Sequence, residues 1–350
     1  MTNYLRTILI SPSGLFYGSE QVLYDYLETT KIKYLVFVPR EGKLLQRLSQ
    51  LKSQHTISVF TPERMIRLYF QIFYLLSFKG YTSLYVNEAG HIKYVVELAK
   101  ILTRKRFFIH VRILEDTAKD RFPTRILHNL KVFTITRYMQ SQFSYPSTMI
   151  YDGYSFKKKA GQRENPENSL FKIGIVGRIS ISKGIDHLLQ ILNKFELNSN
   201  SDIQFQLFGS LDPELEKTEM IKNLKVNSKV RFMGFIDQKD EIYEHMNCML
   251  HLAEKEPLGR IYFEAIEYGI PFIGFNSGGI GEIAARLDYT ELLVDILKPI
   301  DYNKFYEKIR YVQDNFKIVR KLIIEKRSLA ASIFSIDEYT AAIDQAVQNN

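Results

Sequence analysis

The sequence predicts an α/β protein made of two doubly wound units in tandem. Short apolar runs alternate with longer stretches of helical period through the first 150 residues, and this alternation restarts after residue 170. Between them lies the polar stretch Tyr154–Asn168, which carries Gly161 and Pro166 and is typical of a linker. Strands separated by helices form parallel sheets with helices on both faces. A chain of 350 residues also exceeds one ordinary core, so two domains are expected rather than one large one.

The first half contains seven strand candidates and five helical patterns. The strands are expected at Thr7–Ile10, Tyr34–Val38, Ile57–Phe60, Ser83–Val86, Phe107–Val111, Val132–Thr136 and Thr148–Ile150. The helices are expected at Ser19–Glu28, Gly42–Leu51, Pro62–Phe78, His91–Leu102 and Pro123–Asn129. This order predicts a first domain over residues 1–155, followed by a linker over 156–169.

The second half repeats the pattern. Its strands are expected at Lys172–Val176, Phe205–Phe208, Val230–Phe232, Met249–Leu252, Phe272–Phe275 and Glu291–Val294. Its helices are expected at Gly184–Phe195, Asp212–Asn223, Lys239–Met246, Gly259–Tyr268 and Gly279–Leu287, and the chain is helical from Tyr302, including Ile336–Val347. We therefore expect a second domain over 170–330 and a C-terminal helix over 331–350. The cleft between two such domains is the default ligand site.

Composition and charge exclude several classes of protein. The lone Cys248 excludes a disulfide framework, and no apolar stretch is long enough to span a membrane. The N-terminal apolar run is too short for a signal peptide, so we expect a cytoplasmic protein. Residues 1–160 contain 24 Lys and Arg against 11 Asp and Glu, a net charge of +13. Such a half faces nucleic acid or an anionic membrane, or is simply a solvated basic surface.

The residues that carry chemistry lie in the second half. In the stretch Glu254–Glu282, Glu256 and Glu264 stand eight positions apart, on a loop and on the helix that follows it. The N-terminus of such a helix is an anion site, because its first N–H groups point outward. Upstream, Arg178 and Lys183 lie in a strand-to-helix turn, where two cations suit a diphosphate. Carboxylates beside an anion site suit a phosphorylated ligand with hydroxyl groups, such as a nucleotide sugar.

These motifs together resemble the family 4 retaining glycosyltransferases of the GT-B fold, known as glycosyl transferases group 1. The matching segments are Ile175–Arg178 with Lys183-Gly184, the Glu-x7-Glu of Glu256–Glu264, Gly269–Pro271, Gly278–Glu282, Val230–Phe235, Tyr17–Glu20 and Ile150–Tyr154. The resemblance implies two Rossmann-like domains facing a central cleft, with a C-terminal helix that packs back on the first domain. Two positions depart from the family pattern: Ala253 replaces a small hydroxyl residue, and Ser19 replaces the second glycine of a pair.

The resemblance implies a role for each matched residue. Arg178 and Lys183 bind the donor's diphosphate and support its departure, Glu256 contacts the transferred sugar, and Glu264 binds the ribose. The implied catalytic set is Glu256, Lys183, Arg178 and His110. The implied donor-binding set is Gly18, Ser19, Arg178, Lys183, Phe235, Ile236, Glu256, Leu258, Gly259 and Glu264. For His110 the alternative is a satisfied histidine at a strand end. His91 is expected at the surface or on the acceptor side, and core or surface roles are favoured for His187, His245 and His251.

The resemblance also sets the expected reaction. It implies a hexosyltransferase that uses a nucleotide-diphosphate sugar, with UDP favoured, and that retains anomeric configuration in capsule, O-antigen, lipopolysaccharide or related polysaccharide synthesis. The expected partners are the nucleotide sugar and a glycan or lipid-linked acceptor, without nucleic acid. The chain holds no Asp-x-Asp and no His/Cys spacing for a metal, so we expect no cofactor and no metal. The alternatives are an inactive GT-B-like binding subunit and a basic nucleic-acid-binding protein.

The stretch Arg64–Lys79, RMIRLYFQIFYLLSFK, has two interpretations. It is apolar nearly all round and rich in aromatic residues, as is typical of a core helix or of a helix at a membrane interface. A core helix of the first domain is the preferred interpretation, and the basic clusters Arg104–Arg106 and Lys157–Lys159 support the second one. An anionic membrane surface, at the inner face of the cell membrane, is therefore a further expected partner.

Overall fold

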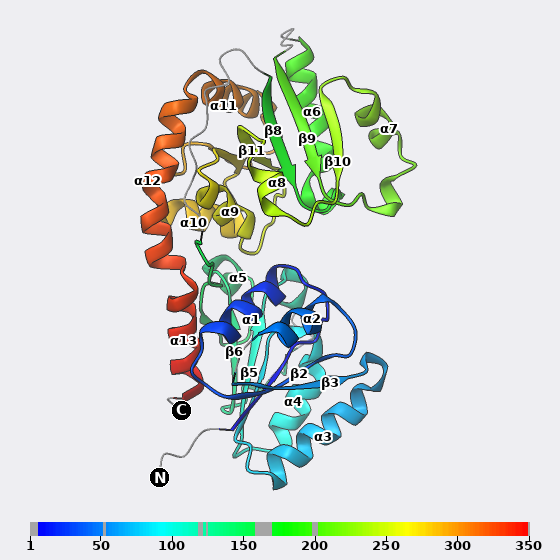
Figure 1. The fold of residues 1–350 in the computed structure, drawn as a ribbon, viewed down its shortest axis with the longest axis vertical. Helices are drawn as coiled ribbons and strands as arrows, with labels where there is room; N and C mark the ends of the chain where they lie inside the picture. The colour runs from blue at the N-terminus through cyan, green and yellow to red at the C-terminus, as the bar shows by residue number, and fades with distance from the viewer. Residues whose placement is uncertain are drawn as a thin grey trace. The chain divides into compact units, whose positions relative to one another are not determined.

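The structure is a computed structural model that describes residues 6–51, 54–117, 122–123, 125–157, 170–197 and 202–348. It contains two compact units (Figure 1). Unit 1 comprises Met1–Ser155 together with Ile333–Asn350, and unit 2 comprises Phe156–Ser332. Residues 158–169 of the expected linker, with Lys158 and Lys159 of the second basic cluster, lie outside the described residues.

Unit 1 is built on a parallel sheet of seven strands in the order β3-β2-β1-β4-β5-β6-β7. The strands are β1 (Thr7–Ile10), β2 (Tyr34–Pro39), β3 (Thr56–Phe60), β4 (Ser83–Val86), β5 (Arg106–Val111), β6 (Leu130–Thr134) and β7 (Thr148–Met149). The helices are α1 (Gly18–Thr29), α2 (Lys43–Gln50), α3 (Met65–Phe78), α4 (Ile92–Ile101), α5 (Arg137–Ser141) and α13 (Ile336–Gln348). Short 3₁₀ turns precede α3 and α4 at η1 (Pro62–Arg64) and η2 (Ala89–His91), and η3 (Leu114–Thr117) follows β5.

Unit 2 has a parallel sheet of six strands in the order β10-β9-β8-β11-β12-β13. The strands are β8 (Phe171–Val176), β9 (Ile203–Phe208), β10 (Val230–Gly234), β11 (Cys248–His251), β12 (Phe272–Phe275) and β13 (Leu293–Val294). The α-helices are α6 (Ile185–Leu197), α7 (Glu219–Val226), α8 (Lys239–Tyr243), α9 (Arg260–Tyr268), α10 (Gly278–Arg286), α11 (Tyr302–Asp314) and α12 (Phe316–Phe334). The 3₁₀ turns are η4 (Ile181–Lys183) and η5 (Pro213–Leu215). The predicted pair of doubly wound α/β units is confirmed.

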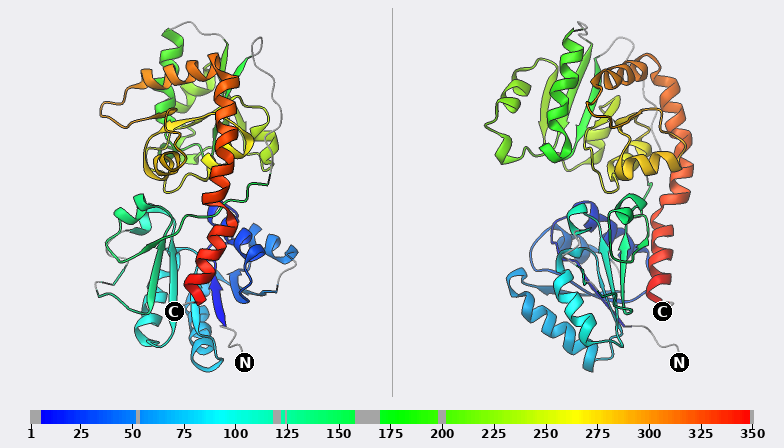
Figure 2. Two further views of the ribbon diagram at one scale, coloured as in Figure 1. Left: turned by 90° about the vertical axis from the view of Figure 1, so that its left-hand side faces the viewer. Right: turned by 180° about the vertical axis from the view of Figure 1, so that it is seen from behind.

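The C-terminal helix α13 completes the core of unit 1, as the resemblance implies (Figure 2). Its buried side chains follow a helical stripe and pack with residues of α1, α2 and the central strands; they are Ile336, Tyr339, Ile343 and Val347. Burying an Ile or Val side chain stabilises a fold by about 1.5–3 kcal/mol. The hydroxyl of Tyr26 in α1 also donates a 2.8 Å hydrogen bond to Asp344. The helix is therefore an integral part of unit 1.

The two chain segments that join the units run side by side where they leave unit 1. The N–H of Tyr154 donates to the carbonyl of Phe334 at 2.8 Å, and the N–H of Ile336 donates to the carbonyl of Tyr154 at 3.2 Å. These bonds form a parallel bridge between Tyr154 and Ser335. A side chain at Gly153 would lie 2.7 Å from Cβ of Tyr339, so a glycine is required at this point.

Several expected element bounds were wrong, for local reasons. The described part of Pro123–Asn129 is not helical. The strand expected at Val132–Thr136 ends at Thr134, because the side chain of Thr136 accepts a hydrogen bond from the N–H of Met139 and caps α5. The helix expected at Asp212–Asn223 is split, since Thr218 caps a new helix that starts at Glu219. His91 was expected at the surface or on the acceptor side; its side chain is buried beside Phe60 and Tyr69, so the surface alternative is wrong, and burial lowers its pKa to about 4.

Candidate functional site

The candidate site of unit 2 lies where the order of its strands reverses. Strands β8 and β11 are parallel neighbours at the centre of the sheet, with Met249 opposite Gly174. The chain leaves β8 toward β9 on one side and leaves β11 toward β12 on the other side. In open parallel sheets, the loops at the carboxyl ends of two such strands separate and leave a crevice that binds ligands. The crevice of unit 2 is therefore expected between the loops after Val176 and after His251.

The loop after β8 is held tightly against the loop after β11. It passes through Gly177 and the turn η4, and ends at Gly184 in a left-handed conformation with a φ of 78°. A Cβ atom at Gly184 would lie only 2.0 Å from the carbonyl oxygen of Leu252, which directly follows β11. Only glycine permits this approach, and it brings Lys183 to the second loop.

Lys183 and Glu256 form an ion pair at this point. The Nζ of Lys183 lies 2.7 Å from Oε2 of Glu256, and Nε2 of His251 lies 3.4 Å from the same oxygen. The Glu256 side chain is 15% exposed, whereas that of Lys183 is 37% exposed. Burial alone would raise the pKa of Glu256, but His251 and Lys183 together lower it to about 2. The carboxylate is therefore ionised at neutral pH, and the ammonium group remains partly open to a ligand.

The loop from Glu256 to Gly259 packs against the start of α10. The N–H of Gly279 donates to the carbonyl of Glu256 at 2.8 Å. A Cβ atom at Gly279 would lie 2.4 Å from Cα of Leu258, so the backbones touch at this position. The loop then enters α9 at Arg260, and the first N–H groups of a helix have no partner within the helix. Such a helix N-terminus, beside Lys183, favours an anionic group.

Glu264 is the second carboxylate of the Glu-x7-Glu pattern, and it lies on α9. Its Oε1 is 2.6 Å from Nζ of Lys239, and its Oε2 accepts a hydrogen bond from the hydroxyl of Tyr243. Both partners belong to α8. The side chain is 16% exposed, so the carboxylate is held in one orientation with a small part of its surface accessible.

A third carboxylate, Glu254, belongs to a cluster that the sequence did not indicate. Its Oε1 lies 2.8 Å from Nζ of Lys298 and 3.2 Å from Nε2 of His187. The hydrogen bond from Lys298 lowers the pKa of Glu254, although burial opposes the shift. The other ring nitrogen of His187 lies 2.8 Å from the hydroxyl of Tyr302. This cluster fixes the loop just before Glu256.

Three other predicted residues are more exposed than the ion pair. Arg178 has an exposed side chain in the loop that also carries Lys183. Phe235 follows β10 and is 61% exposed, and Ile236 is half-buried beside it. These residues belong to loops at the same edge of the sheet as the ion pair.

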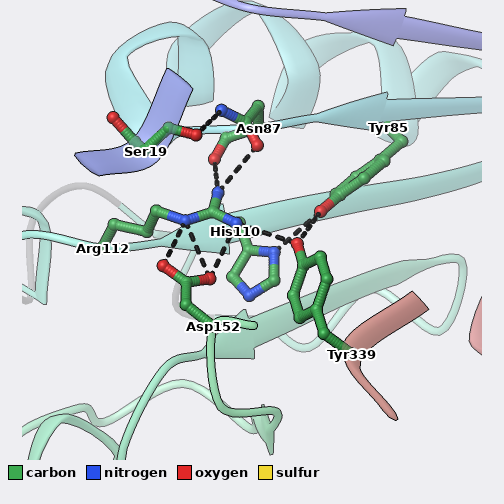
Figure 3. Close-up of polar contacts among 7 residues, drawn as sticks. All are labelled: Ser19, Tyr85, Asn87, His110, Arg112, Asp152 and Tyr339. Atoms are coloured by element: carbon green, nitrogen blue, oxygen red, sulfur yellow. Dashed lines mark hydrogen bonds and ion pairs between the residues drawn. The ribbon is translucent and has the colours of Figure 1, made fainter. Parts of the chain in front are cut away.

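In unit 1, a buried polar network lies at the corresponding edge of the sheet (Figure 3). The guanidinium of Arg112, just after β5, pairs with Asp152 at 2.9 Å and donates to Oδ1 of Asn87 and to the hydroxyl of Tyr339, both at 2.9 Å. Nδ2 of Asn87 donates to the carbonyl of Ser19 at 3.3 Å. Burial works against the charge of Arg112, but Asp152 raises its pKa well above the usual value. The network joins the ends of β4 and β5 to the start of α1 and to α13.

His110 lies inside this network rather than on its surface. Its side chain is fully buried in β5, its Nδ1 lies 2.8 Å from the hydroxyl of Tyr85, and its ring stacks on Tyr339. Its Nε2 has no hydrogen-bond partner among the residues that the structure describes. Burial, with a contribution from Arg112, holds its pKa well below the usual value. Its arrangement is that of a buried neutral histidine, and a catalytic contact would require the side chains over it to move.

Comparison with known proteins now adds to this geometry. Residues 156–328 match the family model described as glycosyl transferases group 1. The matched segment contains the ion pair, the Glu-x7-Glu and nearly all of unit 2. Unit 2 thus resembles a glycosyl transferases group 1 domain over nearly its whole length.

Individual proteins of known name are similar over parts of the chain. The N-acetyl-alpha-D-glucosaminyl L-malate synthase of Bacillus anthracis is 26% identical over 154 residues, 43% of this chain and 39% of its own. The capsular polysaccharide biosynthesis glycosyltransferase CapM of Staphylococcus aureus is 26% identical over 153 residues, 41% of this chain and 40% of its own. The chain therefore matches about two fifths of the length of these curated relatives.

A solved structure resembles the whole chain. Anabaena Alr3699/HepE in complex with UDP and glucose superposes with a TM-score of 0.77 at 16% identity, covering 99% of this chain and all of the other. At this identity the likeness shows the fold alone. It confirms the predicted GT-B architecture of two Rossmann-like units.

Unit 2 also contains polar residues that sequence reasoning missed. His251 was favoured for a core or surface role, yet its Nε2 is directed at Glu256 from the end of β11. His187, Lys239 and Lys298 hold the other two carboxylates. The position of His251 at the carboxyl end of the central strand was a signal that could have identified it. The lysines lie far away in the chain, and no local pattern indicated them.

The described residues contain neither a candidate metal site nor a membrane-spanning helix. No group of three His, Cys, Asp or Glu side chains in the described ranges is placed to hold a metal ion. No helix within those ranges is both long and apolar enough to cross a membrane.

Proposed function

We propose that the protein is a glycosyltransferase that moves a sugar from a nucleotide-diphosphate sugar to a glycan or lipid-linked acceptor. The observation that carries this proposal is the ion pair of Lys183 and Glu256 at the strand-order reversal of unit 2. A cation and an ionised carboxylate side by side suit a ligand whose diphosphate is adjacent to a hydroxylated sugar.

We favour a UDP-sugar as the donor and polysaccharide synthesis as the process. The similar Anabaena protein has been solved with UDP and with glucose, and CapM is named for capsular polysaccharide biosynthesis. In this proposal the enzyme works in the cytoplasm or at the inner face of the cell membrane, where nucleotide sugars are available. Capsule and O-antigen chains are the acceptors of the right chemical class.

Each residue of the candidate site has a role in the proposed complex. Lys183 and Arg178 bind the diphosphate, with the backbone N–H groups of Leu258 and Gly259 at the start of α9. Glu256 accepts hydrogen bonds from the transferred sugar, and Glu264 accepts them from the ribose. The base lies near Phe235 and Ile236. For unit 1, the resemblance implies donor-binding roles for Gly18 and Ser19 and a catalytic role for His110, and the last role requires the side chains that bury His110 to move.

The proposed chemistry retains the anomeric configuration. The bond between the anomeric carbon and the β-phosphate oxygen breaks, and the acceptor oxygen bonds to that carbon on the same face. The acceptor's proton passes to the departing phosphate oxygen. Negative charge grows on the diphosphate during this step, so Lys183 and Arg178 stabilise the transition state more than the ground state. With two cations in this role, we propose that the reaction needs no metal ion and no cofactor.

A thermal-shift series with UDP-, GDP- and dTDP-sugars tests the donor, because a ligand that binds only the folded state raises the melting temperature. We expect UDP-sugars to give the largest increase and the protein to release UDP when a glycan acceptor is added. No increase with any nucleotide sugar would reject the proposal, and binding of the donor without release of UDP for every acceptor tried would identify an inactive binding subunit.

Two further measurements test the proposed chemistry. Loss of turnover in EDTA would contradict the metal-free reaction. The anomeric proton coupling of the product, measured by NMR, tests retention.

A further inference from the structure

Helix α3 exposes a row of large apolar side chains that the proposed reaction does not use. Its inner face is buried in unit 1 through Leu68, Tyr69, Ile72 and Leu76. Its outer face carries Ile66, Phe70, Tyr74 and Phe78, which are 65%, 70%, 48% and 71% exposed. We call these four residues the α3 stripe. The core interpretation of this segment therefore holds for one side of the helix, and the other side is exposed.

The stripe is regular and continuous. Its members are four residues apart and so lie on one side of the helix, over about 18 Å at 1.5 Å per residue. The aromatic rings of Tyr74 and Phe78 contact each other with centroids 5.7 Å apart. Figure 2 shows α3 beside α4 in unit 1, and the rings of Tyr69 and Tyr94 stack between the two helices at 4.7 Å. The helix is thus firmly attached to the unit with its apolar row facing outward.

Cations border the stripe at both ends. Arg64 and Arg67 are exposed at its beginning, and Lys79 is exposed at its end, with its Nζ 5.5 Å from the ring centre of Tyr74. α3 itself contains no acidic residue, and Glu63 lies just before it.

More positive charge gathers beside the end of α3. Arg6 donates to the carbonyl of Lys79 at 3.3 Å, and Lys105 donates to the carbonyl of Tyr81 at 2.7 Å. The exposed Arg104 is adjacent to Lys105 in the chain. These contacts place the first predicted basic cluster next to the stripe.

We propose that the α3 stripe is a membrane-docking surface. In this arrangement α3 lies parallel to an anionic bilayer, and its aromatic side chains insert at the boundary between the headgroups and the acyl chains. Apolar and aromatic side chains on one side of a helix, bordered by Lys and Arg, are the features of an interfacial helix. Lys and Arg extend their charged ends toward the lipid phosphates while their aliphatic parts cover apolar surface. The net charge of +13 over residues 1–160 adds longer-range attraction to the same partner.

A second copy of the chain fits this surface less well. If two copies paired through the stripe in either direction, cations at each end would face cations of the other copy. Interfaces normally juxtapose opposite charges, and like charges oppose association. An anionic lipid surface offers negative charge to the cations at both ends of the stripe. The inference does not depend on the proposed transfer reaction, because lipid binding is measured without donor or acceptor.

Vesicle flotation of the full chain tests the proposal. We expect binding to vesicles of phosphatidylglycerol mixed with phosphatidylcholine, weak binding to phosphatidylcholine alone, and loss of binding as salt increases. The double variant Phe70→Glu, Phe78→Glu should bind the anionic vesicles at least roughly tenfold more weakly than the original protein does. The matched control, Val226→Glu with Ile318→Glu, changes two residues of unit 2 that are 83% and 61% exposed, and should bind as the original protein does.

A fluorescence measurement distinguishes insertion from mere adhesion. The chain has no tryptophan, so Phe70→Trp introduces a single probe within the stripe and Val226→Trp introduces one in unit 2. Anionic vesicles should shift the emission of the first variant to shorter wavelength and leave the second unchanged. Equal responses of the two probes, or equal flotation of the Phe70/Phe78 variant and the original protein, would overturn the proposal. A concentration-dependent dimer that the same variant abolishes, without vesicle binding, would identify a self-association surface instead.

Discussion

The ammonium group of Lys183 and the carboxylate of Glu256 lie 2.7 Å apart, although 73 positions separate them in the chain. Without a ligand, each group neutralises the other. In the proposed complex, a diphosphate would compete with Glu256 for the same ammonium group and would release the carboxylate for the hydroxyl groups of a sugar. In this proposal, binding of the diphosphate to Lys183 makes the Glu256 carboxylate able to accept hydrogen bonds from the sugar.

Replacement of Lys183 by alanine tests the electrostatic half of this site. We expect Lys183→Ala to lower kcat of sugar transfer by roughly 10²–10³-fold, because one fixed donor to the developing charge is lost. Steady-state assays of UDP release measure the effect. The control is Lys222→Ala, which removes the lysine of an exposed pair with Glu219 on α7 and should leave turnover unchanged. Equal activity of the two variants would remove Lys183 from the mechanism.

The low pKa of Glu256 makes stability depend on pH. Its folded pKa of about 2 is below the usual 4.5, so the ionised group stabilises the fold above about pH 4.5. This contribution, on the order of 3 kcal/mol, is lost as the pH falls toward 2. Glu256→Gln, which does not titrate, should therefore show a smaller decrease in melting temperature between pH 6 and pH 3 than the original protein. An equal decrease in melting temperature for the variant and the original protein would show that the Glu256 carboxylate is not stabilised by Lys183 and His251.

Gly279 supports the loop that carries Glu256. In Gly279→Ala the new methyl group would meet Cα of Leu258 at 2.4 Å, which displaces the loop and destabilises unit 2 by about 1–3 kcal/mol. We expect weaker donor binding in a titration followed by thermal shift, in addition to a lower melting temperature. Gly90→Ala is a suitable control, since its methyl group would meet Pro12 at an ordinary 3.5 Å. Unchanged donor affinity in Gly279→Ala would separate α10 from the binding site.

Asp152 stabilises a buried charge in unit 1. Asp152→Ala leaves the guanidinium of Arg112 without its carboxylate partner, which should reduce the free energy of unfolding by about 3–5 kcal/mol. Urea denaturation measures this change. Glu97→Ala is the control, since it removes one partner of an exposed pair with Lys100 and should change stability by less than about 1 kcal/mol. A similar small loss for Asp152→Ala would mean that water or another group compensates the guanidinium.

The fold was largely predictable, because apolar runs of four to six residues identify buried parallel strands by themselves. Thr7–Ile10, Ser83–Val86 and Phe272–Phe275 were predicted to the residue. Predictions were wrong where a side chain decides the local structure, as where Thr136 ends a strand by capping α5. The motif identified Lys183 and Glu256, but no spacing in the sequence reveals that they are in contact.

The contacts between distant segments were beyond the reach of sequence patterns. Tyr339 bonds Arg112 from 227 positions away, and Lys298 bonds Glu254 from 44 positions away. His91 was misplaced for a similar reason, because α3 buries it through tertiary packing with Tyr69. Such partners depend on which helices cover which face of the sheet, and that is settled only when the chain is folded.

The bridge between Tyr154 and Ser335 makes unit 2 an insertion within unit 1. During synthesis, the ribosome therefore completes all of unit 2 before it makes α13, the last helix of unit 1. Until then Arg112 lacks Tyr339, and the core of unit 1 lacks the apolar side chains that α13 supplies. We therefore expect unit 1, although its first residues are made first, to complete its native core only after unit 2 has been synthesised.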